Sequence, residues 1–76
     1  MRLLYFYRTA VGRFYIGEER GRFHVIFGSV SFGSYSSPQE AAQDLAWGRT
    51  DVIGPALNTR DLRISAKIEN WTVEPL

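Results

Sequence analysis

Side chains that could support catalysis or bind a metal are few and scattered in this 76-residue chain. His24 is the single histidine, it lies in an alternating apolar segment, and the sequence contains no cysteine. General acid–base catalysis or a metal site needs several such groups that converge, and no cluster of His, Asp or Glu surrounds His24. We therefore interpret His24 as a surface residue of a strand, and we expect no catalytic residue, no metal and no other cofactor.

Three further patterns come near known catalytic or phosphate-binding motifs without matching them. Glu18 and Glu19 are adjacent on a predicted strand, so they point to opposite faces and form no acid–base pair. Gly28–Gly33 is glycine-rich, but it lacks the Gly-Lys-Ser/Thr ending of a phosphate-binding loop and opens no helix. The serines of residues 34–37 lie outside a Gly-x-Ser-x-Gly frame, and turn or capping roles explain them. These patterns predict a protein that is not an enzyme.

What remains is a predicted surface on which aromatic and arginine side chains alternate. Arginine pairs with phosphate or guanine and flat rings stack on bases, so such a surface can bind nucleic acid. An ordinary solvated sheet face carries the same residue types, because Tyr and Arg suit strands. The candidate binding residues are Tyr5, Tyr7, Arg13, Tyr15, Arg22 and His24, with Ile26 beside them and Arg8 and Arg20 near the edges.

Four alternating segments must position these side chains. Each is separated from the next by a turn that contains glycine, which predicts an antiparallel β-meander of three to four strands. The segments are Leu3–Thr9, Arg13–Glu18, Arg22–Phe27 and Val30–Tyr35, and the turns are residues 10–12, 20–21 and 28–29.

Two of these turns can be tested against the apolar pattern. A two-residue Gly28-Ser29 turn places Phe27 opposite Val30, and a two-residue Arg20-Gly21 turn places Ile16 opposite Val25. Both assignments put the same apolar residues on one face of the sheet, which supports the meander. The predicted apolar face consists of Phe14, Ile16, Phe23, Val25, Phe27, Val30 and Phe32.

The first strand is apolar on both faces, so its register depends on the turn that follows it. A three-residue loop of residues 10–12, with Gly12 left-handed, would turn Leu4 and Phe6 inward. We favour this register because it leaves the tyrosine hydroxyls within reach of water. A two-residue Val11-Gly12 turn would instead turn inward the other set, Leu3, Tyr5 and Tyr7.

Residues 37–48 carry the start and stop signals of one helix. Ser37 suits the N-cap, Pro38 the first helical position, Glu40 completes a Ser-x-x-Glu capping box, and Gly48 supplies a left-handed stop. A helix with a small apolar side can approach the sheet phenylalanines closely and cover one sheet face, which predicts a two-layer α+β domain. That side consists of Ala41, Ala42 and Leu45, with Ala46 at its margin.

Residues 49–76 lose clear periodicity, and we expect them to close an edge or an end of the core. Gly54-Pro55 predicts a turn, Asn58 or Thr59 could cap a short helical piece, and Ser65–Trp71 is compatible with a second helix. The apolar residues expected to fold back are Leu57, Leu62, Ile64, Ile68 and Trp71.

Length and composition favour one small soluble α+β domain over residues 1–76, with the meander in 1–36, the helix in 37–48 and the closing segment in 49–76. The sequence shows no signal peptide and no membrane span, and the lack of cysteine fits a cytoplasmic protein. Residues 1–36 carry five Arg against two Glu, whereas residues 37–76 carry four basic against six acidic side chains. The basic bias therefore lies in the strand-rich half, although the net charge is only +1.

The stretch from Phe32 to Ala42, Phe-Gly-Ser-Tyr-Ser-Ser-Pro-Gln-Glu-Ala-Ala, resembles the strand-to-helix junction of the plant ethylene-response-factor type DNA-binding domain, to which N-terminal domains of some phage integrases are related. That junction has a Gly, an aromatic residue, a capping Thr or Ser and then Glu-Ala-Ala. The resemblance covers about residues 22–47 and implies a three-stranded antiparallel sheet on one helix, with the sheet in the DNA major groove. The closest strand positions are Arg13, Tyr15, Arg22 and His24; the family's Arg-rich opening strand and its strand tryptophans are missing here.

Two hypotheses about function follow. The first is a non-enzymatic module that binds DNA weakly through the exposed sheet face. The alternative is a protein-interaction module, a homodimer included, that uses the edge of the first strand or an apolar, tyrosine-rich sheet face. We expect no membrane and no small-molecule substrate as partner. Salt separates the two hypotheses, because phosphate contacts weaken steeply with salt and an apolar interface does not. The tyrosine-rich face would consist of Tyr5, Tyr7, Tyr15 and Ile26.

Overall fold

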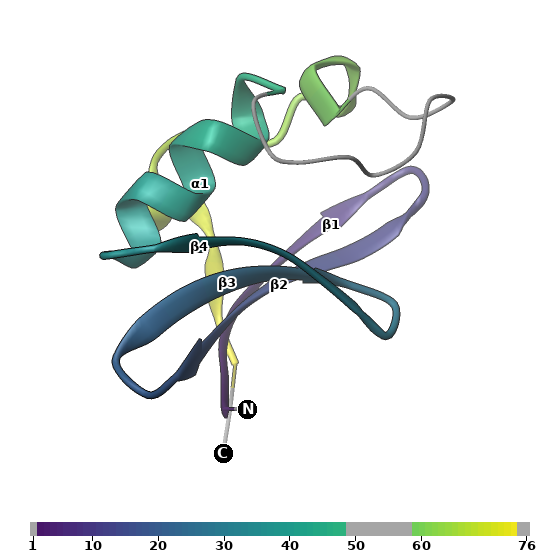
Figure 1. Ribbon diagram of the computed structural model, residues 1–76. Helices are drawn as coiled ribbons and strands as arrows, with labels where there is room; N and C mark the ends of the chain where they lie inside the picture. Colours follow the sequence, from purple (N-terminus) through teal and green to yellow (C-terminus); the bar gives the residue numbers. More distant parts are fainter. Residues whose placement is uncertain (1, 49–58, 75–76) are drawn as a thin grey trace.

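The computed structural model describes residues 2–48 and 59–74, and it shows an antiparallel sheet with one α-helix on one of its faces (Figure 1). The five strands lie in the order β4-β3-β2-β1-β5, so the predicted α+β meander is confirmed and gains a fifth strand. The elements are β1 (Arg2–Thr9), β2 (Gly12–Glu19), β3 (Arg22–Phe27), β4 (Val30–Tyr35), α1 (Pro38–Ala46), the 3₁₀ turns η1 (Thr59–Leu62) and η2 (Ile68–Asn70), and β5 (Thr72–Val73).

The registers of β2, β3 and β4 are those that the turn residues predict. Ile16 lies opposite Val25, and Phe27 lies opposite Val30. The β2–β3 turn has positive φ at both central residues, 53° at Arg20 and 78° at Gly21, as a type I′ turn requires. The right-handed twist of such a turn matches that of the strands, so it accounts for the tight hairpin.

The register favoured for β1 is wrong. Thr9 pairs with Gly12, Tyr7 with Phe14 and Tyr5 with Ile16, so both tyrosines lie on the core face and Phe6 lies on the opposite face. The turn consists of Ala10 and Val11 alone, because the Thr9 hydroxyl donates to the Gly12 carbonyl (2.7 Å) and accepts from the Val11 N–H (3.2 Å). A register shift between Leu3 and Tyr5 then marks a bulge in β1.

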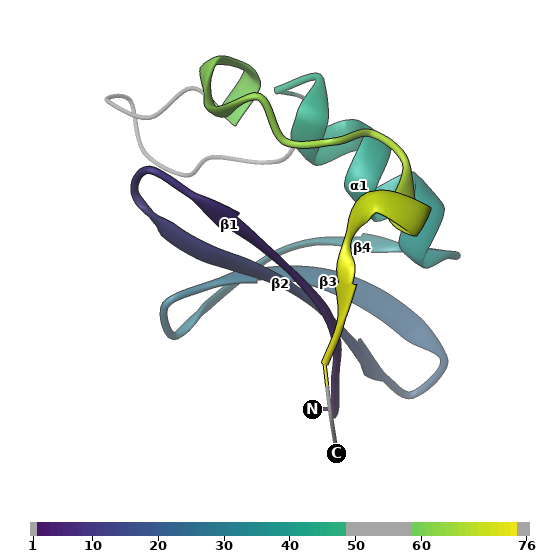
Figure 2. The same cartoon turned by 180° about the vertical axis from the view of Figure 1, so that it is seen from behind.

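The inward tyrosines are tolerated because α1 does not cover β1. The helix packs on β3 and β4 and touches β2 more lightly, while the chain that leads into β5 covers β1 from the same side (Figure 2). The Tyr7 ring lies 5.3 Å from the Trp71 ring, and both tyrosines remain only half-buried. The need to keep the tyrosine hydroxyls within reach of water is therefore no reason to prefer one β1 register over the other.

Helix α1 begins and ends as its capping residues predict. Ser37 is the N-cap, with its side-chain oxygen accepting from the Glu40 N–H (3.2 Å), and Pro38 occupies the first turn. The Glu40 carboxylate accepts a hydrogen bond from the hydroxyl of Ser36, the residue before the cap. Trp47 is the C-cap, and Gly48 follows with a φ of 73°.

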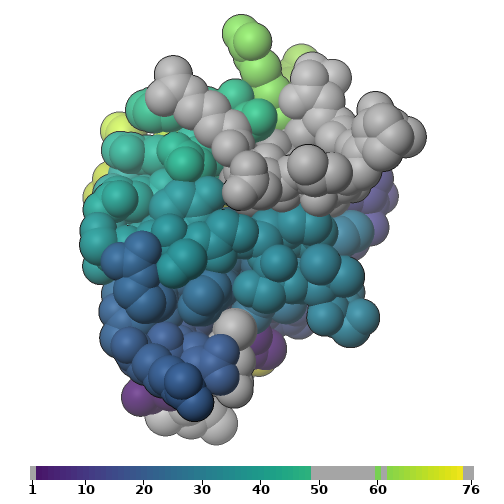
Figure 3. All heavy atoms as spheres, in the orientation of Figure 1, coloured from purple at the N-terminus to yellow at the C-terminus, as the bar shows by residue number. Residues whose placement is uncertain are grey.

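The core lies between α1 and the sheet and extends under the C-terminal segment. The predicted member Val30 is 51% exposed, because it follows the β3–β4 turn, which projects away from the helix (Figures 1 and 3). Phe23, Phe27 and Phe32 are partly buried and pack against the core. The buried core residues are Phe14, Ile16, Val25, Ala41, Ala42, Leu45, Ile64 and Trp71.

The predicted second helix over Ser65–Trp71 is wrong, since only Ile68–Asn70 forms a single 3₁₀ turn. The Gln39 side chain donates to the Ala66 carbonyl (2.8 Å) and accepts from the Ile68 N–H (3.0 Å). These two bonds engage backbone groups that a helix would use in its own ladder. The predicted short helical piece is present as η1, whereas residues 54–58, including Gly54-Pro55, Leu57 and Asn58, lie outside the described residues.

Strand β5 closes part of the β1 edge, as expected of the C-terminal segment. Thr72 pairs with Phe6, Val73 pairs with Tyr5, and the Glu74 N–H donates to the Leu4 carbonyl (2.8 Å). Ile64 and Trp71 enter the core, and Leu62 and Ile68 pack against it. Among the described residues, no helix combines the length and apolar character needed to cross a membrane.

We expect Leu45→Asp to unfold the protein. Leu45 is fully buried against the sheet, and an unpaired carboxylate there should lower the free energy of unfolding by more than about 4 kcal/mol. That is a large share of the total stability of so small a domain. Circular dichroism during heating should show no cooperative transition. Gln43→Asp, on the same helix but at a half-buried polar position, should keep the transition. A sharp transition in the Leu45 variant would contradict this packing.

We expect Arg20→Asn to stabilise the protein by about 0.5–1 kcal/mol, a rise of a few degrees in Tm. Arg20 adopts a φ of 53°, which is strained for most side chains and tolerated by Asn, and Asn-Gly is the preferred pair for a type I′ turn. Lys67→Asn removes the same charge where φ is −98°, and it should leave Tm nearly unchanged. An Arg20 variant that melts no higher than the Lys67 variant would refute the strain argument.

Candidate functional site

The face of the sheet that points away from α1, called the outer face below, carries the candidate residues in rows. Cross-strand pairing defines the rows, because paired residues of adjacent strands share a face. The row nearest the β1–β2 turn contains Arg8 and Arg13. The next row contains Thr72, Phe6, Tyr15, Ile26 and Ser31, one residue from each of the five strands.

Four residues of these rows form what we call the arginine–aromatic cluster: Phe6, Arg8, Arg13 and Tyr15. Arg8 and Arg13 are exposed and lie directly opposite each other, a placement in which like charges repel. The guanidinium carbon of Arg13 lies over the Phe6 ring, 4.6 Å from its centroid, within cation–π range. The Tyr15 ring centroid lies 6.1 Å from that of Phe6, with the planes tilted by 47°. The cluster therefore combines two cations with two half-buried rings.

Arg22 and His24 lie at the other end of the outer face and are engaged with β4. Arg22 donates to the Ser34 side-chain oxygen (3.0 Å) and to the Ser34 carbonyl (3.1 Å), and His24 Nδ1 lies 2.9 Å from the Gly33 carbonyl oxygen, to which it donates. The structure thus separates the sequence-predicted site into a cluster around Arg13 and Tyr15 and a second pair that braces a neighbouring strand.

The segment that Arg22 and His24 brace is a bulge in β4. Val25 pairs with Phe32 but Phe23 pairs with Tyr35, so β4 contains one residue more than β3 over this stretch. Gly33 has a φ of 69°, and its Cα lies against the Tyr35 ring, which a Cβ would approach to 2.8 Å. Glycine is therefore required here both by the backbone conformation and by the ring.

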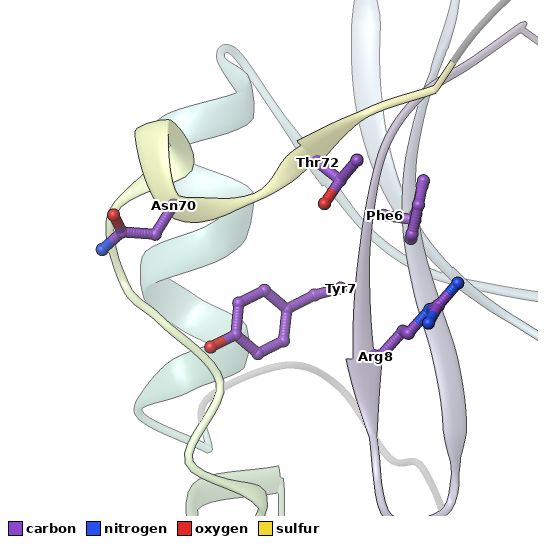
Figure 4. A pocket seen from close by; sticks show the side chains of 5 residues that line it. All are labelled: Phe6, Tyr7, Arg8, Asn70 and Thr72. Carbon is purple, nitrogen blue, oxygen red and sulfur yellow. The ribbon is translucent and has the colours of Figure 1, made fainter.

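A hollow of about 420 Å³ lies beside the cluster, at the edge of β1 (Figure 4). It exists because β5 begins at Thr72, which pairs with Phe6. No β5 residue therefore pairs with the part of β1 between Phe6 and the β1–β2 turn. Arg8 and Phe6 belong both to the cluster and to the hollow, while Tyr7 enters it from the other face of the strand (Figure 4). Its lining residues are Phe6, Tyr7, Arg8, Asn70 and Thr72.

No protein-family model matches the chain, and no curated protein or solved structure is significantly similar to it. The case for a function therefore rests on the site itself. Within residues 2–48 and 59–74, no three His, Asp or Glu side chains gather into a group that could hold a metal. Tyr5 and Tyr7, two of the predicted site residues, lie away from the outer face.

Sequence reasoning missed Phe6, Asn70 and Thr72 as parts of this site. Phe6 was assigned to the core because of the wrong β1 register. Asn70 and Thr72 carry no local sign of a role, since they reach the site only through the fold of residues 59–74 against β1. A correct choice between the two β1 registers would have identified Phe6.

Gly33→Ala should destabilise the protein more than Gly28→Ala. Both glycines have positive φ, 69° and 64°, so each substitution costs about 1–2 kcal/mol through the backbone. Only at Gly33 does the new methyl group also meet a ring, since nothing lies within 4 Å of the corresponding position at Gly28. Urea unfolding should therefore show that Gly33→Ala lowers the free energy of unfolding by at least about 1 kcal/mol more than Gly28→Ala does. Equal losses would mean that the Tyr35 ring moves aside without cost.

Proposed function

We propose that this chain is a small non-enzymatic module that binds DNA weakly through the outer face of its sheet. The facing pair of Arg8 and Arg13 carries the proposal. Two exposed arginines paired across adjacent strands repel, and a phosphate bound by both would replace that repulsion by charge-assisted hydrogen bonds. Phe6 and Tyr15 lie beside the pair and offer rings to sugars or bases.

The distribution of charge supports an anionic ligand at this end of the sheet. Residues 1–36 carry five Arg and two Glu, and of these two, Glu19 lies opposite Arg22, away from the cluster. The Glu18 side chain accepts from the Gly21 N–H in the β2–β3 turn. A face with two arginines in its basic row contacts few phosphates, so its affinity is expected to be low.

The resemblance of Phe32–Ala42 to the strand-to-helix junction of the plant ethylene-response-factor type domain adds support. That resemblance implies an antiparallel sheet laid on one helix, which is also the arrangement of β2, β3, β4 and α1. Here, however, Arg22 and His24 are bonded to β4, and Arg8 and Phe6 come from the additional strand β1. We therefore assign the contacts to Phe6, Arg8, Arg13 and Tyr15, with Arg22 and His24 as supports of β4.

For the alternative, a protein-interaction module, only the version that uses an edge strand remains. The tyrosine-rich face loses Tyr5 and Tyr7 to the core, so Tyr15 and Ile26 are left of that patch. Strand β5 covers part of the first-strand edge, whereas β4 is the last strand on the other side of the sheet, where a partner strand can pair. The DNA hypothesis is favoured because two facing arginines suit an anion and do not suit an apolar interface.

The double substitution Arg8→Gln with Arg13→Gln tests the proposal. We expect fluorescence anisotropy with a labelled DNA of mixed sequence, offered both as a duplex and as its separate strand, to show binding that falls between about 50 and 200 mM salt. The double variant should bind about tenfold or more weakly than the unmodified chain. The slope of log binding constant against log salt concentration should also become shallower by up to about two.

Lys67→Gln is the matched control, because it removes an exposed positive charge on the loop before η2 and should bind as the unmodified chain does. Arg22→Gln should weaken binding less than Arg13→Gln, since two Arg22 donors already serve Ser34. Binding that survives the loss of both Arg8 and Arg13 would refute the proposed surface.

A further inference from the structure

The cluster combines two aromatic rings with only two positive charges. Arg8 and Arg13 are the cations of its basic row, and Arg22 is engaged with Ser34. Duplex DNA is held mainly through phosphate contacts, so two arginines support little duplex affinity. Aromatic and guanidinium surfaces, in contrast, bind the faces of bases, which a duplex hides between neighbouring base pairs. The cluster therefore fits unstacked bases better than a double helix.

The hollow beside β5 continues this surface. Phe6 and Arg8 belong to the cluster and also line the hollow, so the two adjoin. Figure 4 shows these two side chains beside Thr72. This hollow of about 420 Å³ is open to solvent and combines aromatic walls with a hydroxyl. Thr72 contributes a hydroxyl to this lining, whereas the Asn70 amide donates to the Ser65 hydroxyl (3.0 Å) and points away from the other lining side chains (Figure 4).

The backbone of Arg8 adds a donor and an acceptor at the same place. In an antiparallel ladder, every second residue directs its N–H and C=O to the same side. The Glu74 N–H donates to the Leu4 carbonyl, and Thr72 pairs with Phe6, so Leu4, Phe6 and Arg8 direct these groups toward the β5 side. Because β5 begins at Thr72, opposite Phe6, the backbone N–H and C=O of Arg8 face no β5 residue and open toward the hollow.

We propose that the DNA bound by the outer face is single-stranded and that the hollow receives one of its bases. This inference rests on the function proposed above. The phosphates lie on Arg8 and Arg13, one base stacks on the cluster, and the next enters the hollow, where the backbone groups of Arg8 and the Thr72 hydroxyl meet its polar edge.

The test compares a labelled single strand of about 12 nucleotides with the duplex that it forms with its complement, by fluorescence anisotropy at about 50 mM salt. The single strand should bind about tenfold more tightly than the duplex. Phe6→Leu should weaken single-strand binding about tenfold, because it removes the ring and keeps an apolar side chain. Thr72→Val should weaken single-strand binding several-fold.

Val73→Ala is the matched control, since Val73 is exposed on the same short strand and faces the other way from Thr72. Thermal unfolding of every variant identifies any that does not fold. Duplex binding equal to or tighter than single-strand binding, still dependent on Arg8 and Arg13, would overturn this inference and leave the proposed function standing. Binding of neither form would overturn both.

Two further outcomes would overturn parts of the inference. If Phe6→Leu weakens single-strand binding but Thr72→Val does not, no base enters the hollow. If an RNA strand of the same sequence binds more tightly than the DNA strand, the ligand is not DNA.

Discussion

The pairing of Thr9 with Gly12 is the constraint on which the rest of the site depends. Successive side chains of a strand point to opposite faces, so one residue of slip in β1 exchanges its two faces completely. The Thr9 hydroxyl bonds both Val11 and Gly12 in the two-residue turn that accompanies this register. With that register, Tyr5 and Tyr7 enter the core, and Phe6 and Arg8 join Arg13 and Tyr15 on the outer face.

The C-terminal segment depends on a second, more distant contact. Gln39, in the first turn of α1, bonds the backbone at Ala66 and Ile68 through both ends of its amide. Trp71 then enters the core, with its indole N–H donating to the Ser65 carbonyl (3.0 Å), and its ring packs near Tyr7. A chain held in this way first pairs with β1 at Thr72, which leaves the part of β1 beyond Phe6 without a β5 partner and accounts for the hollow there.

The arginines of the strand-rich half differ in what surrounds them. Arg22 has two hydrogen bonds to Ser34 and stabilises the β4 bulge together with His24. Arg13 contacts a ring, and its cross-strand neighbour is another arginine. A pair of like charges lowers stability, whereas a bond to a carbonyl raises it, so the two groups of residues divide into a ligand-facing set and a bracing set. Composition alone counts all of them as one basic patch.

Much of the architecture follows from local residue chemistry in the sequence. Ser37, Pro38 and Gly48 determine where α1 begins and ends, and the Arg20-Gly21 and Gly28-Ser29 turns determine the pairing of β2, β3 and β4, because each acts within a few residues. These features also predict the α+β class and the buried face of Ala41, Ala42 and Leu45.

Tertiary structure decided the rest. Strand β1 is apolar on both sides, so its alternation cannot choose a face, and the choice depends on Trp71 and on the limited reach of α1. Residues 65–70 could form a helix locally, but the Gln39 amide, 27 and 29 residues from its partners, holds their backbone in another shape. The cluster and the hollow are products of these long-range contacts, and contacts between residues far apart in the chain leave no periodic pattern in the sequence from which to predict them.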